Sequence, residues 1–147
     1  MADSATFRQL LSKTTETAER PRALAIGHYI GEIKTYSFGE SSQKKTPFVR
    51  FIMVPTEETE DVPEGANEGI DFSKKELRKD LYITPEALYR LTDFLNSVLG
   101  EQNGRTFDER IPETRSVRVL IQVGQRENER NPEEKFNEVG TVVAYNG

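Results

Sequence analysis

The side chains that could do chemistry in this sequence favour binding over covalent catalysis. The chain has no cysteine and one histidine, His28, which removes thiol nucleophiles, thiolate metal sites and multi-histidine metal sites. His28 itself is interpreted as an ordinary strand or turn residue. No P-loop or GxGxxG motif is present, and the acidic stretch EETEDVPEGANEGID lacks the ligand spacing of an EF-hand. We therefore predict no catalytic residue, no metal and no cofactor, and an enzyme that uses carboxylates and a metal ranks last.

Cationic and aromatic side chains gather in one stretch, FGESSQKKTPFVRFIM, which spans residues 38–53. In its second half, alternation gives one wholly apolar strand face and one mixed face that carries Phe48 and Arg50. Proteins bind single-stranded nucleic acid with cations that follow the phosphates and rings that stack on the bases, at roughly 1–3 kcal/mol per base. The stretch therefore predicts a binding face for a single strand, or, as an open alternative, a solvated strand beside its turn.

The predicted site extends over neighbouring strands and loops. Lys44 and Lys45 lie in the loop before the strand, and the later loop 125–135 holds further cations. Base stacking is assigned to the aromatic members, of which Tyr36 and Phe48 could instead cover an edge of the core. The predicted nucleic-acid-binding residues are Lys34, Tyr36, Lys44, Lys45, Phe48, Arg50, Arg78, Tyr82, Arg126 and Arg130, with Lys135 beside the last two.

Length and composition set the frame for these residues. The chain has 147 residues, a net charge of −5 and 31% charged residues, which fits one domain with a modest core. The acidity argues weakly against a generic nucleic-acid binder, although the local distribution of charge matters more than the total. No apolar run approaches the roughly 20 residues of a membrane helix, and the first residues lack a secretory h-region. We expect a cytoplasmic protein with no membrane partner.

The elements that must position the site are predicted from periodicity and turn residues. Residues 1–23 are expected to form an arm with a helix over 4–19, and residues 24–147 one domain. The predicted strands cover residues 24–38, 47–54, 76–83, 116–124 and 136–145, and the predicted helix covers residues 84–100. An acidic loop at about 56–75 is compatible with disorder. This order predicts a mainly β fold, a five-stranded OB-like barrel plugged by the helix, with a β-sandwich as the alternative.

Parity within the strands assigns side chains to faces. In residues 24–38, Lys34 and Tyr36 share the parity opposite to Ile33, so both are expected beside Phe48 and Arg50. Arg78, Asp80 and Tyr82 share one face of their strand. Glycines at 27 and 31 indicate a bend or a close backbone approach. The helix is expected to begin at the N-cap Thr84, to end at Gly100, and to bury Leu88, Leu91, Leu95, Val98 and Leu99.

Four short patterns carry a family resemblance: GHYIGEI, PFVRFIMV, VRVLIQV and FNEVGTVV. Together they resemble the small phage-encoded single-stranded-DNA-binding proteins over roughly residues 24–145. The last pattern matches an aromatic-Asn-x-Val motif through Phe136, Asn137 and Val139. The resemblance implies an OB-type fold and a role in phage replication, recombination or repair. The chain departs from the better-known bacterial proteins of this class, because it lacks tryptophan and ends just after the last strand without an acidic tip.

We therefore expect a non-enzymatic protein that binds single-stranded DNA with little sequence preference. Replication or recombination proteins and a second copy of the chain are further candidate partners. The alternative is a protein-interaction module that assembles a virion or replisome. The acidic loop at 57–71 could recruit partners, or it could compete with nucleic acid for the basic face as an intramolecular mimic.

Overall fold

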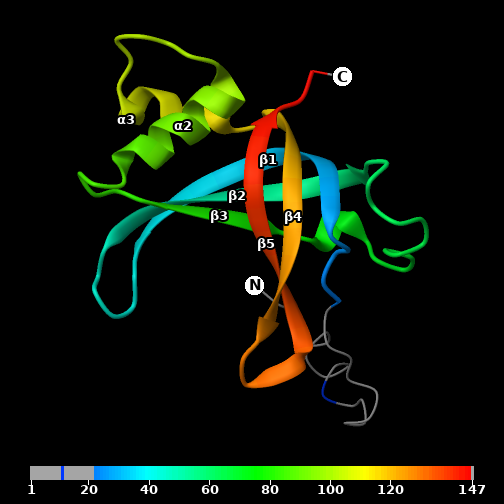
Figure 1. The fold of residues 1–147 in the computed structure, drawn as a ribbon. Helices are drawn as coiled ribbons and strands as arrows, with labels where there is room; N and C mark the ends of the chain where they lie inside the picture. The colour runs from blue at the N-terminus through cyan, green and yellow to red at the C-terminus, as the bar shows by residue number, and fades with distance from the viewer. Residues whose placement is uncertain (1–10, 12–21, 147) are drawn as a thin grey trace.

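The chain is folded mainly as β-structure in the computed structural model, which describes residue 11 and residues 22–146 apart from the side chains of 131–134. Five antiparallel strands form one sheet in the order β3-β2-β1-β4-β5 (Figure 1). The strands are β1 (Gly27–Glu40), β2 (Pro47–Glu58), β3 (Leu77–Tyr82), β4 (Arg118–Asn128) and β5 (Asn131–Ala144). The predicted five-stranded, mainly β fold is thus confirmed at this level. The predicted helix over 4–19 lies, apart from residue 11, outside the described residues.

One face of the sheet is buried, and the alternation of buried and accessible side chains is clearest along β2 and β4. On β2, Val49, Phe51 and Met53 are fully buried, as their alternation predicts. We call this the inner face and the opposite one the outer face. The other fully or nearly fully buried residues of the strands include Tyr29, Ile33, Leu77, Leu81, Val119, Ile121, Val123 and Val142.

Helix α2 (Leu88–Leu99) packs against β3 and β5 and completes the core. Its buried side chains are Leu91, Phe94, Leu95 and Val98. Phe94 was missing from the predicted stripe, and its ring centroid lies 4.4 Å from that of Phe51. Gly100 ends the helix as predicted, with a φ of 87° that favours glycine. None of the described helices is long and apolar enough to cross a membrane.

The predicted start of this helix is wrong by several residues. Thr84 caps a turn instead, because its hydroxyl accepts a hydrogen bond from the Ala87 N–H at 3.2 Å before the regular helix begins at Leu88. The connector after α2 was predicted without structure, but it contains α3 (Phe107–Arg110) and the 3-10 helix η3 (Ile111–Thr114). The buried Arg110 holds this connector against α2, because its guanidinium donates to the carbonyl oxygens of Leu95 and Gly100 near the end of that helix.

The chain between β2 and β3, residues 59–76, is folded rather than disordered, and we call it the acidic segment. Strand β2 runs to Glu58, beyond the predicted limit, and the segment then forms turns and the 3-10 helix η2 (Phe72–Lys74). Asn67 is buried and donates to the Tyr29 hydroxyl at 2.7 Å, while its side-chain oxygen accepts the Ala25 N–H at 2.8 Å. Burial raises the pKa of Tyr29. Polar contacts of this kind tie the segment to the start of β1.

The close approach predicted at the two glycines is present. A Cβ at Gly31 would lie 2.7 Å from the Val54 carbonyl oxygen, and one at Gly27 would lie 2.5 Å from a methyl carbon of Val62. Contacts this short leave no room for a side chain, so β1 can meet β2 and the acidic segment here only with glycine.

The β4–β5 connection also differs from the prediction. Residues 125–135 are not a loop, because β4 and β5 continue pairing until Asn128 faces Asn131. The sheet is curled so that its two edges approach each other. Lys79 on the inner face of β3 reaches β5, where its ammonium donates to the carbonyl oxygens of Gly140 at 3.0 Å and Val139 at 3.4 Å. A side chain rather than a backbone ladder thus links the two edge strands.

Candidate functional site

The outer face of β2 and β3 carries a compact group of rings and charges. Phe48 and Tyr82 face each other across the two strands, with ring centroids 6.3 Å apart in an edge-to-face arrangement. The Arg50 guanidinium lies 5.3 Å from the centre of the Phe48 ring. Tyr82 is 45% exposed, and Phe48 is half-buried. Four predicted residues, Phe48, Arg50, Arg78 and Tyr82, therefore share one surface, which we call the aromatic face.

Carboxylates pair with both arginines of the aromatic face. The Arg50 Nε and Nη2 donate to the two carboxylate oxygens of Asp80 at 2.8 and 2.9 Å, and this raises the pKa of the guanidinium. The Arg78 guanidinium lies 3.4 Å from the Glu76 carboxylate. Sequence reasoning placed Asp80 on the right face but gave it no role. A phosphate that binds Arg50 would have to compete with Asp80.

A β-bulge removes Tyr36 from the aromatic face. Ile33 pairs with Met53 and Thr35 with Ile52, so Lys34 is an extra residue between consecutive pairs. The bulge reverses the parity, and Tyr36 pairs with the buried Phe51. The prediction that Tyr36 lies beside Phe48 is therefore wrong. Its ring packs against the core with the Arg115 guanidinium 4.8 Å from the ring centre.

The remaining predicted cations lie on other strands and on the two turns. Lys34 is exposed beside Glu32, 3.6 Å away. Lys44 and Lys45 are exposed on the β1–β2 turn. Arg130 lies in the β4–β5 turn, and Arg126 is part of β4, with its Nε 3.7 Å from Glu138. Lys135, also predicted, lies exposed on β5 opposite Glu127.

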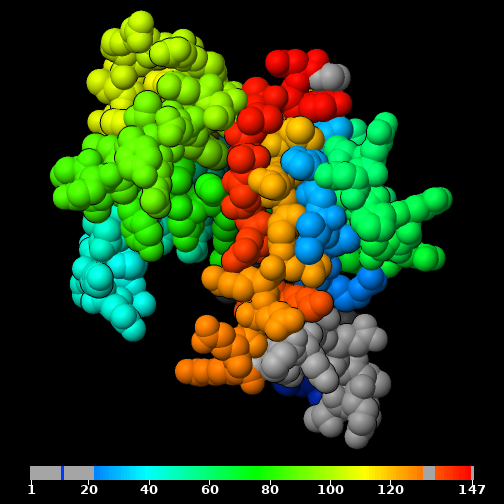
Figure 2. Space-filling view, in the orientation of Figure 1, coloured from blue at the N-terminus to red at the C-terminus, as the bar shows by residue number. Residues whose placement is uncertain are grey.

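The space-filling view shows where the β1–β2 and β4–β5 turns lie. Figure 2 shows the surface hollowed between the β1–β2 turn and the β4–β5 hairpin. The two turns project on either side of this hollow. The structure thus keeps the cations of the two turns apart, rather than in one cluster.

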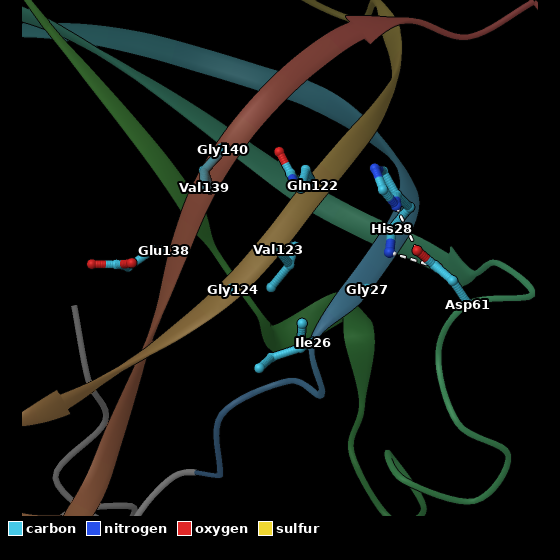
Figure 3. A pocket seen from close by; sticks show the side chains of 10 residues that line it. All are labelled: Ile26, Gly27, His28, Asp61, Gln122, Val123, Gly124, Glu138, Val139 and Gly140. Carbon is cyan, nitrogen blue, oxygen red and sulfur yellow. Dashed lines mark hydrogen bonds and ion pairs between the residues drawn. The ribbon is translucent and has the colours of Figure 1, made fainter.

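A second candidate site surrounds the single histidine. A pocket of about 360 Å³ is lined by residues of β1, β4, β5 and the acidic segment, and we call it the histidine pocket. His28 and Asp61 face each other on one side of the pocket, Gln122 lies between them and β5, and Glu138 projects from β5 (Figure 3). Within the described part of the chain, the residues that line it carry no hydroxyl, thiol or amine that could act as a nucleophile.

Asp61 is held by several hydrogen bonds. One carboxylate oxygen lies 2.6 Å from the His28 Nδ1, and the other accepts the His28 backbone N–H at 2.9 Å and the Thr59 hydroxyl at 2.7 Å. The His28 side chain, then the backbone N–H and the hydroxyl, hold the pKa of Asp61 far below its usual range. The arrangement favours a structural clamp between β1 and the acidic segment over a catalytic pair. Sequence reasoning treated His28 as ordinary and missed this partner, because Asp61 lies in a loop without periodicity.

Metal ligands do not converge within the described part of the chain, where no group of three histidine or acidic side chains could hold an ion. Comparison with known proteins gives no family: no protein-family model matches the chain, and no curated protein is significantly similar to it.

Proposed function

We propose that the protein binds single-stranded DNA without marked sequence preference and without catalysing a reaction. The observation that carries this proposal is the exposed Tyr82 ring beside Phe48 and Arg50 on one sheet face. Rings of this kind offer a stacking surface to any base, since every base has a π-face. The lysines of the β1–β2 turn lie at the end of the same strand and supply charge for the phosphates.

An OB-type barrel is the fold that we propose for this function. The strand order β3-β2-β1-β4-β5, with Lys79 linking β3 to β5, supports a partly open five-stranded barrel over a β-sandwich. In such a barrel the face of the second and third strands binds oligonucleotides, flanked by the first-to-second and fourth-to-fifth strand loops. In the proposed barrel, the aromatic face and the β1–β2 and β4–β5 turns would take these positions. The resemblance to phage single-stranded-DNA-binding proteins would place the activity in replication, recombination or repair.

The net acidity of the chain is compatible with this proposal because of where the acidic segment lies. The acidic segment and the turn lysines lie at opposite ends of the β1–β2 hairpin (Figure 1). The acidic segment begins after Glu58, which pairs with Tyr29. The turn lysines lie between Glu40 and Pro47, which pair at the other end. An acidic segment that mimics nucleic acid would have to cover the aromatic face and the turn lysines. The acidic segment is instead tied to the start of β1. We therefore no longer favour the mimic hypothesis.

The alternative, a protein-interaction module, is supported by a different observation. Ile26 is 61% exposed at the histidine pocket, and Val143 and Phe136 on β5 are 41% and 42% exposed. Burial of Tyr82 would have favoured this alternative, but the ring is accessible. Tyr36 is half-buried under Arg115 and gives the stacking surface no support.

A salt titration of binding to oligo-dT tests the proposal. If Lys44, Lys45 and Arg50, with Arg78 and Arg126, contact phosphates, the slope of log K against log salt should be about −3 to −4 for a single strand. Duplex DNA and an RNA oligonucleotide of the same length serve as comparison ligands. No measurable binding of oligo-dT at low salt would falsify the proposal.

A further inference from the structure

A pocket adjoins the aromatic face at the β1–β2 turn. It has a volume of about 500 Å³ and lies between residues 41–46, Tyr82 and the turn that begins at Thr84. We call it the turn pocket. Its walls are fixed by backbone hydrogen bonds: the Ser41 N–H donates to the Thr46 carbonyl at 2.9 Å, and the Ile83 N–H donates to the Pro47 carbonyl at 2.8 Å. The pocket is therefore a built feature of the hairpin end and not a gap between mobile side chains.

The chemistry of the turn pocket is unlike that of the rest of this acidic chain. Among the described residues, Lys44 is the only charged one that lines it, and none of them is a carboxylate. The histidine pocket, by contrast, is lined by Asp61 and Glu138. A pocket that excludes carboxylates and presents an ammonium suits an anionic ligand.

Two hydroxyl oxygens of the turn pocket accept hydrogen bonds from the backbone. The Ser41 Oγ already accepts the Thr46 N–H at 2.9 Å, and the Thr84 Oγ1 accepts the Ala87 N–H at 3.2 Å. A hydroxyl that accepts from the backbone keeps its own proton for another acceptor. With the Gln43 amide and the Lys44 ammonium, the pocket offers several donors, which is the complement of a phosphate with its many acceptor oxygens.

The Tyr82 ring joins the pocket to the aromatic face. The same ring lines the pocket and meets Phe48 across the two strands. A strand that stacks a base on the aromatic face can therefore pass its next nucleotide over Tyr82 into the pocket. The volume is sufficient for one nucleotide, whereas the open sheet face offers only a stacking surface.

We propose that the turn pocket takes one nucleotide of the bound strand, with its base against Tyr82 and its phosphate near Lys44 and the hydroxyls. This inference rests on the proposed function, since it concerns the strand that the aromatic face binds. The aromatic face alone would offer a continuous stacking surface, and the turn pocket adds one defined site for a single nucleotide.

A mononucleotide titration tests the pocket separately from the strand. Backbone amide shifts are recorded while thymidine 5′-monophosphate, thymidine or inorganic phosphate is added, and oligo-dT binding is measured on the same sample. We expect the nucleotide to shift residues 41–46 and 82–87 more than either fragment does. If oligo-dT binds but the nucleotide leaves these residues unshifted, or inorganic phosphate shifts them equally, the pocket proposal is wrong while the proposed function stands. If neither the oligonucleotide nor the nucleotide binds, both proposals fail.

An isosteric charge change gives a second, independent measurement. Gln43→Glu places a carboxylate in the pocket wall without changing the size of the side chain, and we expect it to weaken oligo-dT binding about fivefold, which is half a decade or more in Kd. Gln102→Glu makes the same change in net charge beyond α2, where the side-chain oxygen accepts from Arg105 at 2.8 Å, and it should leave the affinity unchanged. Equal effects of the two variants would overturn the assignment, because only net charge would then matter.

Discussion

The β1–β2 hairpin ends in two very different ways. At its turn, Lys44 and Lys45 are exposed, and the adjoining pocket is lined by hydroxyls and Tyr82 without a carboxylate. At the opposite end, the acidic segment folds back onto the start of β1. There Asp61 accepts hydrogen bonds from the His28 N–H and the Thr59 hydroxyl. Asn67 accepts the Ala25 N–H and donates to the Tyr29 hydroxyl. At the turn, the lysine ammonium groups and the Tyr82 ring are accessible to a ligand. At the opposite end, Asp61 and Asn67 form their hydrogen bonds with other residues of the protein.

The two ends of the β1–β2 hairpin are therefore expected to have different roles, ligand binding at the turn and stability at the opposite end. A buried side chain whose hydrogen bonds all go to the protein contributes to folding, and its removal leaves partners unsatisfied. An exposed ring or ammonium contributes little to folding and is available to a ligand. We therefore expect substitutions at the two ends to act on different measurements, and each prediction below tests that separation.

The largest effect should come from Asn67→Ala at the clamped end. The substitution leaves the Ala25 N–H without its acceptor and removes the donor to the buried Tyr29 hydroxyl, so the free energy of unfolding should fall by about 2–3 kcal/mol. Urea denaturation measures this, with the exposed Asn103→Ala as the control. Oligo-dT affinity of the folded variant should remain that of the wild type. A loss of affinity in folded protein would break the separation of the two ends.

Tyr82→Ala should have the opposite signature. Loss of one stacking ring should weaken oligo-dT binding by about 1–3 kcal/mol, while the free energy of unfolding changes by less than about 1 kcal/mol because the ring is 45% exposed. Tyr145→Ala is the control, since that ring also lies near an arginine, 5.3 Å from the Arg118 guanidinium. Affinity that survives Tyr82→Ala would remove the main support for the proposed function.

The same contrast shows what sequence could predict. Alternation identified the five strands and the buried face of β2, because the pleat places every second side chain on one side. It placed Phe48, Arg50, Arg78 and Tyr82 on one surface. It misplaced Tyr36, since a bulge at Lys34 reverses the parity and no glycine marks that position.

Contacts between distant segments were beyond reach for a physical reason. Composition made the acidic segment compatible with disorder, yet three hydrogen bonds from Asn67 tie it to the strands and to residue 25. The two bonds to Ala25 and Tyr29 join residues that lie far apart in sequence, and only the packed fold brings them together. The pairing of Arg50 with Asp80 was closer to prediction, because both residues were already assigned to the same face.

Asp80→Asn should strengthen binding at the turn end. The substitution releases Arg50 from a paired carboxylate and removes a negative charge beside the proposed phosphate path. Affinity for oligo-dT should rise about threefold, because a phosphate no longer competes with Asp80 for Arg50, and the salt slope should be at least as steep as that of wild type. The cost in stability should be below about 1 kcal/mol, because the ion pair is partly exposed. Asp93→Asn on α2 controls for net charge, and a weaker salt slope in Asp80→Asn would contradict Arg50 as a phosphate ligand.

Asp61→Asn should have the smallest effect, and its pH dependence identifies the clamp. Hydrogen bonds from His28 and Thr59 hold the pKa of Asp61 far below that of an unfolded aspartate, which is about 3.9. A group with a depressed folded pKa contributes stability above its unfolded pKa and loses that contribution as the pH falls toward the folded value. The denaturation midpoint of wild type should therefore exceed that of Asp61→Asn at pH 6, and the difference should begin to narrow as the pH falls below about 4. Asp108→Asn on α3 serves as the control for the loss of one negative charge. Parallel curves for wild type and Asp61→Asn over this range would mean that the carboxylate does not fasten the acidic segment, and the clamped end of the hairpin would then depend on Asn67 alone.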